Sequence, residues 1–150
     1  MKKIILSFVS FLLFCSASIA QVKKTDSKPF VLGVTDKIQS VILSESRTLN
    51  IYLPEGYSPD SATTYPVIYL LDGSADEDFI HVSGLVQYLS FPWINAAPKS
   101  IVVGIANVDR KRDFTYPSKN QEDVKLCPTS GGSEKFICFL EKEVQPYIQK

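Results

Sequence analysis

Two short polar segments hold the residues that are best suited to chemistry in this sequence. Asp72-Gly73-Ser74 directly follows an apolar run over 67–71, and Asn107-Val108-Asp109-Arg110 follows a second apolar run over 100–106. Carboxylate, amide and guanidinium groups are suited to hydrogen bonding with a ligand. Their use depends on whether the chain brings the two segments together.

A nucleophile of a familiar kind is missing from these residues. The 150-residue sequence contains neither a G-x-S-x-G elbow nor an S-x-x-K motif, and Gly73-Ser74 and Gly132-Ser133 are the nearest approximations. The single histidine, His81, falls early in a predicted helix. We expect it to be an ordinary helix-surface or packing residue, because a general base must lie within hydrogen-bond reach of the group it deprotonates.

The two apolar runs are predicted to be neighbouring parallel strands. The unbroken run from Val67 to Leu71 indicates a strand that is covered on both faces, because a strand with one wet face alternates. Between the runs lies a core-facing helical stripe made of Val82, Leu85, Val86 and Leu89. A strand, a helix and a strand in this order form a βαβ unit, whose strands end at the same edge of a parallel sheet. Ligands bind at that edge in such folds, so it is the candidate active edge.

The segments before the βαβ unit predict a hairpin. The stretches 36–43 and 47–53 are rich in β-branched residues and leucine, and Ser44-Glu45-Ser46 separates them. Two strands joined by so short a link should pair antiparallel.

The segments after the βαβ unit predict a long loop and a final helix. Residues 108–128 are polar, irregular and too long for an ordinary connection. Ser133 is the expected N-cap of the helix, and Pro146 predicts a kink or an early end. The helix is expected to place four residues on one face, namely Phe136, Leu140, Val144 and Tyr147.

The N-terminus has the pattern of a secretory signal peptide over residues 1–20. A basic start, an apolar stretch over 4–14 and the small-residue end Ser18-Ile19-Ala20 follow one another. Cleavage near Ala20 predicts an exported protein, periplasmic or secreted, with no membrane span left after cleavage. A flexible polar leader is then expected over 21–35, and one domain over 36–150. With 16 basic and 16 acidic residues, nothing points to a nucleic-acid partner, and the oligomeric state stays open.

The sequence leaves open whether the two cysteines of the predicted domain form a disulfide, and it argues against a metal site at the acidic cluster. Cys127 and Cys138 form either a disulfide, which an oxidising compartment permits, or two separate thiols. Asp76-Glu77-Asp78 lacks the glycine spacing of a calcium loop, and acidic residues are favoured at a helix start by the helix dipole. We therefore expect no metal site.

Several motifs, in order, resemble one family of esterases. The segment 47–57 (RTLNIYLPEGY) is similar to the pattern R-x-L-x-V-Y-L-P-x-G-Y, and 65–73 (YPVIYLLDG) resembles YPVLYLLDG. The segment 104–117 resembles the loop G-I-x-N-x-x-R-x-R-D-x-T-P with one extra residue, Tyr116, and 130–140 matches S-G-G-x-x-x-F-x-x-F-L. These are patterns of the family of esterase D and enterochelin-esterase-like proteins, which are α/β-hydrolases. The resemblance covers 36–150.

The resemblance implies an α/β fold, specifically the N-terminal part of an α/β-hydrolase: an antiparallel hairpin, then parallel strands with flanking helices. It implies that Gly73 and Ser74 supply an oxyanion-hole N–H. It also suggests that Arg110, Arg112 and Asp113 contact substrate, although they could equally pair with each other. The nucleophile elbow, acid and histidine of the family lie further on, so the chain is predicted to stop before them.

Two functions follow as hypotheses. The first is the N-terminal portion of an exported serine esterase, whose parent acts on a small-molecule ester through an acyl-enzyme without metal or cofactor; the 150 residues alone are predicted to be inactive. The alternative is a non-catalytic secreted binding module, or one that a partner completes. Ester hydrolysis by a longer chain that carries G-H-S-x-G-G distinguishes them.

Overall fold

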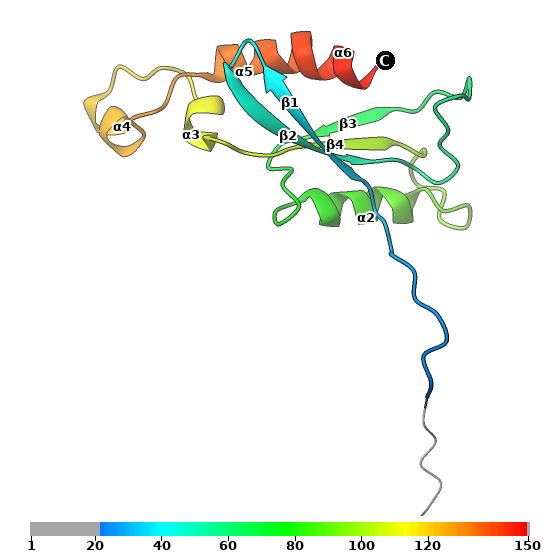
Figure 1. The fold of residues 1–150 in the computed structure, drawn as a ribbon. Coiled ribbons are helices and arrows are strands. Elements are labelled where there is room, and N and C mark those ends of the chain that lie inside the picture. The colour runs from blue at the N-terminus through cyan, green and yellow to red at the C-terminus, as the bar shows by residue number, and fades with distance from the viewer. Residues whose placement is uncertain (1–21, 150) are drawn as a thin grey trace, which may run out of the picture. The chain divides into compact units, whose positions relative to one another are not determined.

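A four-stranded sheet forms the centre of the structure, a computed structural model that describes residues 22–149 (Figure 1). The predicted signal peptide over 1–20 lies outside the described residues. The strands are β1 (Val34–Ser40), β2 (Glu45–Tyr52), β3 (Val67–Leu70) and β4 (Ile101–Ile105), in the order β1-β2-β4-β3. The β1–β2 hairpin is antiparallel, as predicted, and occupies one edge. β3 and β4 are parallel neighbours, which confirms the βαβ prediction.

The register places residues of three strands side by side in the middle of the sheet. Val103 of β4 lies between Ile51 of β2 and Tyr69 of β3. One residue later, Gly104 lies between Asn50 and Leu70. Because successive residues of a strand point to opposite faces, these two rows face different helices.

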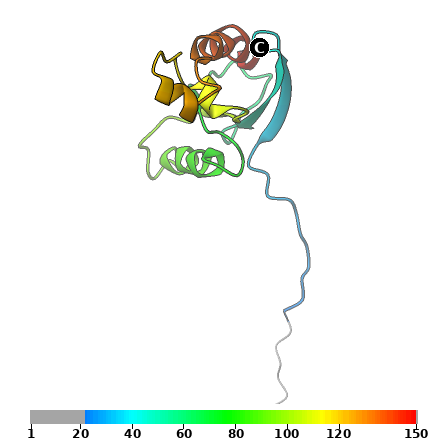
Figure 2. The same ribbon diagram turned by 90° about the vertical axis from the view of Figure 1, so that its left-hand side faces the viewer.

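The helices cover both faces of the sheet (Figures 1 and 2). On one face, α2 (Phe79–Leu89) packs through Phe79 and Val86 against Tyr52 and Val102. On the other face lies a continuous helix made of α5 (Ser133–Phe139), the π-helical turn η1 (Leu140–Val144) and α6 (Gln145–Ile148). Its buried side chains join those of β2 and β4 in a second cluster, which comprises Leu49, Ile51, Val103, Ile105, Phe136, Phe139 and Val144.

The expectation that the run 67–71 is covered on both faces is wrong. In the described chain β3 is an edge strand, paired with β4 alone, and Ile68 and Leu71 are 38% and 42% exposed. β4 is the strand that is covered on both faces, with Val102 and Val103 fully buried. An unbroken apolar run indicates that the side chains of a strand are largely shielded from water. It does not tell whether the strand pairs with one neighbouring strand or with two.

The predicted helical stripe of α2 is correct except at Leu85. Phe79, Ser83 and Val86 are buried, whereas Leu85 is 46% exposed. The face that meets the sheet is the one that carries Phe79, Ser83 and Val86, and Leu85 lies outside it. The pattern of four apolar residues did not contain this information.

The hairpin turn lies earlier than the predicted link at 44–46. β1 ends at Ser40, the turn covers 41–44, and β2 already begins at Glu45. The carboxylate of Glu143, from η1, accepts hydrogen bonds from the backbone N–H groups of Val41 and Ile42, at 2.9 Å and 3.2 Å. A residue about a hundred positions away therefore caps this turn.

The C-terminal helix differs from the prediction at its start, and at Pro146 it neither ends nor breaks but continues to Ile148 after a π-helical turn. Gly132 is the N-cap, whereas Ser133 already lies inside the helix, with a buried hydroxyl that has no hydrogen-bond partner among the described residues. Just before Pro146 the helix widens, because the N–H of Gln145 donates to the carbonyl of Leu140, five residues earlier. Proline has no N–H and its ring cannot enter a regular helical ladder, which fits this local irregularity.

The long connection between β4 and α5 contains two short helices, α3 (Arg110–Asp113) and α4 (Gln121–Leu126). Before β1, residues 22–33 are neither helix nor strand. The first strand thus begins within the leader predicted over 21–35. In the described part of the chain, no helix is long and apolar enough to cross a membrane.

Candidate functional site

The two polar segments meet at the carboxyl ends of β3 and β4, as the sequence predicts. The side-chain amide of Asn107, which follows β4, donates to the carboxylate of Asp72, which follows β3, at 2.7 Å. We call Asp72, Ser74, Glu77, Asn107 and Arg110 the rim cluster. It stands where open α/β sheets bind ligands.

Asp72 is the centre of the rim cluster. Its backbone has a φ of 54°, in the left-handed region that few non-glycine residues adopt. The guanidinium of Arg110 binds its carboxylate with two nitrogens, at 2.8 Å and 3.1 Å. The hydrogen bond from Arg110, together with that from Asn107, holds the pKa of Asp72 below its usual value. Asp72 is therefore a carboxylate that orients its neighbours and does not act as an acid at neutral pH.

Of the three residues predicted to contact substrate, Arg110 is the one that lies at the rim, where it binds Asp72. Its side chain is 63% exposed, and its guanidinium also lies over the ring of Phe114, 5.1 Å from the centroid. The hydrogen bond to Asp72 raises the pKa of Arg110, so the side chain stays charged. A fixed and exposed guanidinium at this edge is suited to contact a polar or anionic part of a ligand.

The two predicted oxyanion donors, the N–H groups of Gly73 and Ser74, differ in whether they are already hydrogen-bonded. The N–H of Gly73 donates to the carbonyl of Ile105 at 3.1 Å and is therefore occupied. The N–H of Ser74 has only a long contact, 3.4 Å, to the carboxylate of Glu77. Ser74 is thus the donor of this pair that is able to turn to a ligand, whereas Gly73 is not while its bond to Ile105 is formed.

The glycine at position 73 allows close packing between the loop after β3 and β4. A Cβ on Gly73 would lie 2.3 Å from the Cα of Gly104. The two backbones touch directly, and no side chain fits between them. The loop after β3 therefore packs directly on the backbone of β4.

Arg112 and Asp113 do not face the rim, and the alternative that they pair with each other is the one the structure has. The Nε of Arg112 binds Asp113 at 2.7 Å, and its Nη atoms bind Glu45 at 2.6 Å and 3.0 Å. Hydrogen bonds to Glu45, and then to Asp113, raise the pKa of Arg112. Substrate contact by these two residues is therefore not supported.

A buried arginine, Arg47, is the partner that the sequence reasoning missed. Its side chain is fully buried and binds Asp113 and Glu45, at 2.5 Å and 2.7 Å. Its guanidinium lies 5.4 Å and 5.6 Å from the ring centroids of Phe136 and Phe139. The available signal was the alternation along β2, where position 47 shares the face of two core residues, Leu49 and Ile51.

The remaining predicted residues stand apart from the rim cluster. His81 is exposed on α2, as expected of a helix-surface residue. Cys127 and Cys138 are free thiols, so the disulfide alternative is not the one observed. Among residues 22–149, no group of three or more histidine, cysteine or acidic side chains is placed to hold a metal ion.

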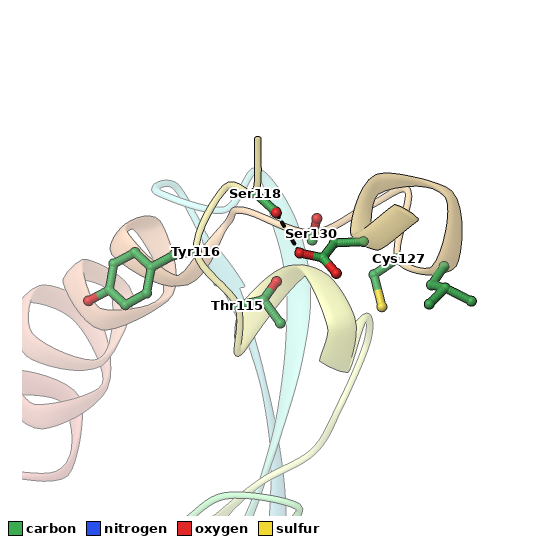
Figure 3. Close-up of a pocket in the computed structure, with 7 residues that line it drawn as sticks. Thr115, Tyr116, Ser118, Cys127 and Ser130 are labelled. Atoms are coloured by element: carbon green, nitrogen blue, oxygen red, sulfur yellow. Dashed lines mark hydrogen bonds between the residues drawn. The ribbon is translucent and has the colours of Figure 1, made fainter. Parts of the chain in front are cut away.

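One hollow lies within the connection between β4 and α5 (Figure 3). It measures about 270 Å³ and is lined by Thr115, Tyr116, Ser118, Asp123, Leu126, Cys127 and Ser130. The hydroxyl of Ser118 donates to Asp123 at 2.7 Å and so ties the loop to α4, while Tyr116 points away from the other labelled side chains. None of the lining residues belongs to the rim cluster.

The contacts of Glu77, a member of the rim cluster, and of Asn50, which supports the cluster from β2, escaped the sequence reasoning as well. The sequence places Glu77 at a helix start, yet its carboxylate lies 3.3 Å from the amide of Asn107. Asn50 is one residue of a predicted strand, yet its amide reaches the carbonyl of Gly73 at 2.8 Å. Neither contact has a local signal, because each joins segments far apart in the sequence.

Comparison with known proteins shows the family and the fold of this chain. The family model described as "Putative esterase" matches residues 40–150. The ferri-bacillibactin esterase BesA of Bacillus subtilis (strain 168) is 27% identical over 136 residues, which is 83% of this chain and 47% of BesA. The chain thus spans about half the length of this curated relative.

Solved structures show the same relationship. An IroE-like serine hydrolase from Shewanella oneidensis is 37% identical, with a TM-score of 0.66, over 78% of this chain and 38% of that protein. The BES protein of Bacillus cereus is 25% identical, with a TM-score of 0.65, over 86% and 50%. A siderophore hydrolase, EstA of Aspergillus nidulans, shares the fold with a TM-score of 0.68 at 17% identity. The fold is that of the α/β-hydrolase-like esterases, and the chain belongs to the esterase family whose model it matches.

Proposed function

We propose that this chain is the N-terminal portion of an exported serine esterase, which cleaves carboxylic esters through an acyl-enzyme. The observation that carries the proposal is the position of the Ser74 N–H. It lies at the carboxyl edge of the sheet in a chain of the esterase family, and its one contact is the long one to Glu77. In α/β-hydrolases an N–H from the loop after this strand is half of the oxyanion hole.

In the proposed reaction, a serine oxygen attacks the ester carbonyl and a histidine takes the serine proton. The carbonyl oxygen becomes an oxyanion, which accepts a hydrogen bond from the Ser74 N–H. The C–O bond to the alcohol then breaks, and the alcohol leaves with the proton from the histidine. Water, activated by the same histidine, then hydrolyses the acyl-enzyme. The oxyanion takes the place of the Glu77 carboxylate at the Ser74 N–H.

The nucleophile, the acid and the histidine are proposed to belong to a segment that follows residue 150 in a longer protein. Residues 1–150 contain no G-x-S-x-G, and their single histidine lies exposed on α2. The matched relatives extend well beyond the aligned part, since the chain covers 47% of BesA and 38% of the Shewanella hydrolase. We therefore expect the 150 residues alone to be inactive.

The proposed substrates are esters of the siderophore type. Two similar proteins are named for such substrates, the ferri-bacillibactin esterase and the fungal siderophore hydrolase. Arg110 is the side chain of the rim cluster that is proposed to contact a polar or anionic part of the substrate, because it is charged, oriented and largely exposed. Export is proposed from the signal pattern of residues 1–20.

The test compares the longer protein with residues 21–150 in an assay with a short-chain nitrophenyl ester. We expect turnover by the longer protein, and none by the shorter piece. Replacing the serine of a downstream G-H-S-x-G-G by alanine should abolish turnover, because loss of the nucleophile costs on the order of a millionfold in kcat. A longer protein that folds but hydrolyses no ester would instead favour the second candidate, a non-catalytic binding module. The observation that supports this candidate is that residues 1–150 contain no G-x-S-x-G motif.

A further inference from the structure

Asn50 links the hairpin to the loop that carries the proposed oxyanion donor. The residue is 4% exposed and lies on the face of β2 that is covered by α2. Its Nδ2 donates to the carbonyl oxygen of Gly73 at 2.8 Å. Its Oδ1 accepts a hydrogen bond from the hydroxyl of Thr35 on β1, also at 2.8 Å. The amide orientation is therefore defined at both ends.

The contact crosses an entire strand, and Gly104 makes the crossing possible. In the sheet, β4 lies between β2 and β3, and Gly104 is the residue of β4 opposite Asn50. A Cβ on Gly104 would lie 2.5 Å from the oxygen of Gly73 and 2.7 Å from the ring of Phe79. Without that atom, the Gly73 carbonyl reaches over β4 and meets the Asn50 amide directly.

The geometry of one peptide group gives this hydrogen bond its consequence. The carbonyl of Gly73 and the N–H of Ser74 belong to the same planar, trans peptide, so they point in opposite directions. When Asn50 holds the oxygen on the buried side, the N–H of Ser74 is turned to the opposite side, where it meets Glu77. The rotation of this peptide plane is therefore set from β2.

We propose that Asn50 is a positioning residue for ester hydrolysis, which aims the Ser74 N–H at the oxyanion by clamping the Gly73 carbonyl. The inference rests on the proposed function and adds a specific requirement to it. Asn50 touches neither the substrate nor the reacting atoms. Its effect belongs to the transition state, because the donor must meet the oxygen where the charge develops.

The experiment uses the whole protein and the variants Asn50→Leu and Thr35→Val. Leucine keeps the approximate shape of asparagine and removes the donor. We expect a ten- to hundredfold lower kcat with KM changed less than about threefold, since a misplaced oxyanion donor costs rate and leaves ground-state binding largely intact. Thr35→Val leaves Asn50 in place and releases its Oδ1, so a smaller fall in kcat, about two- to fivefold, is expected.

Ser40→Ala is the matched control. Ser40 is also buried on the hairpin, and its hydroxyl bonds Glu143 and the N–H of Leu43, away from the rim. This variant should be less stable with kcat within about twofold of the parent, as expected for a purely structural hydrogen bond. If Asn50→Leu and Thr35→Val both behave like Ser40→Ala, with lower stability and unchanged kcat, the proposal is overturned.

A crystal structure gives a readout that does not depend on activity. In Asn50→Leu, or in Thr35→Val if the first variant does not fold, the Gly73–Ser74 peptide should be rotated from its parent orientation. An unchanged peptide overturns the proposal, whatever the kinetics. A parent that hydrolyses no ester, together with a rotated peptide in the variant, would refute the proposed function and leave the clamp itself supported.

Discussion

The guanidinium of Arg47 and the carboxylate of Asp113 are bound 2.5 Å apart in the interior, although they are 66 positions apart in the sequence. Arg47 comes from β2 and Asp113 from the end of α3, the short helix that also carries Arg110. The pair thus attaches the segment after β4 to the hairpin. Arg110, at the other end of the same short helix, lies at the rim.

Loss of Asp113 should strongly destabilise the protein. Asp113→Ala leaves the buried Arg47 with one carboxylate partner, Glu45, and we expect the free energy of unfolding to fall by about 3 kcal/mol, as for broken buried ion pairs. Denaturant unfolding of the whole protein measures it. Glu141→Ala, which breaks the exposed pair with Lys142, is the control and should change stability by less than about 0.5 kcal/mol. Equal effects of the two substitutions would show that the buried network is dispensable.

The Asp72 carboxylate should make stability depend on pH in the acidic range. Its pKa is lowered in the folded protein by Arg110 and Asn107, so the unfolded chain binds the proton more readily. The contribution is fully present above the unfolded pKa of about 3.9 and is lost as the pH falls through the lower folded value. The stability difference between the parent and Asp72→Asn should therefore shrink toward zero on acidification. A stability difference between the parent and Asp72→Asn that stays constant from neutral pH to below the folded pKa would contradict the assignment. Asp60→Asn, in an exposed loop, is the control.

The Ser74 donor is tested by removing its N–H and keeping its neighbours. Ser74→Pro deletes the hydrogen, and in the whole protein we expect kcat to fall about a hundred- to a thousandfold, as for the loss of one oxyanion donor. Ser74→Ala removes the hydroxyl only and should retain most of the activity. The comparison is made at saturating nitrophenyl ester. Equal kcat values in the two variants would exclude the Ser74 N–H as a donor.

Replacing Gly104 by alanine and replacing Gly84 by alanine should have opposite effects on stability, because a Cβ has no room at position 104 and ample room at position 84. A Cβ at position 104 meets backbone at 2.5 Å, so Gly104→Ala should lower the free energy of unfolding by about 1–3 kcal/mol through overpacking. A Cβ on Gly84, in α2, would meet nothing within 4 Å beyond its own helix, and Gly84→Ala should raise stability by about 0.5–1 kcal/mol. Thermal melting of both variants checks the pair. A neutral Gly104→Ala would mean that the β3 loop is free to move away from β4.

The outer edge of β3 should make residues 21–150 poorly soluble or loosely packed on their own. In the described chain β3 pairs on one side only, and Ile68 is 38% exposed. Unpaired strand edges with apolar side chains are templates for aggregation. Ile68→Lys should raise the soluble fraction, measured by sedimentation and light scattering. Val41→Lys, in the hairpin turn, is the control and should not; a parent fragment that melts cooperatively and reversibly as a monomer would contradict the prediction.

Much of the fold was contained in local patterns. Apolar runs and a helical stripe predicted the hairpin, the βαβ unit and the final helix, because side-chain periodicity determines which elements can bury a face. The meeting of Asp72 with Asn107 also followed, since parallel strands joined by a helix must end at the same edge. The family motifs were equally readable, because they are short stretches of the chain itself.

Tertiary structure alone decided the partners of the individual groups. Whether β3 is an edge, whether the Gly73 N–H is free, and whether Arg112 faces ligand or Glu45 each depend on segments far away in the sequence. A hydrogen bond forms between whichever groups the packing brings within about 3 Å, and no local propensity encodes that distance. For the same reason nothing in the sequence indicated a role for Asn50. Its hydrogen bond to the Gly73 carbonyl, which passes over Gly104 of β4, is visible only in the structure.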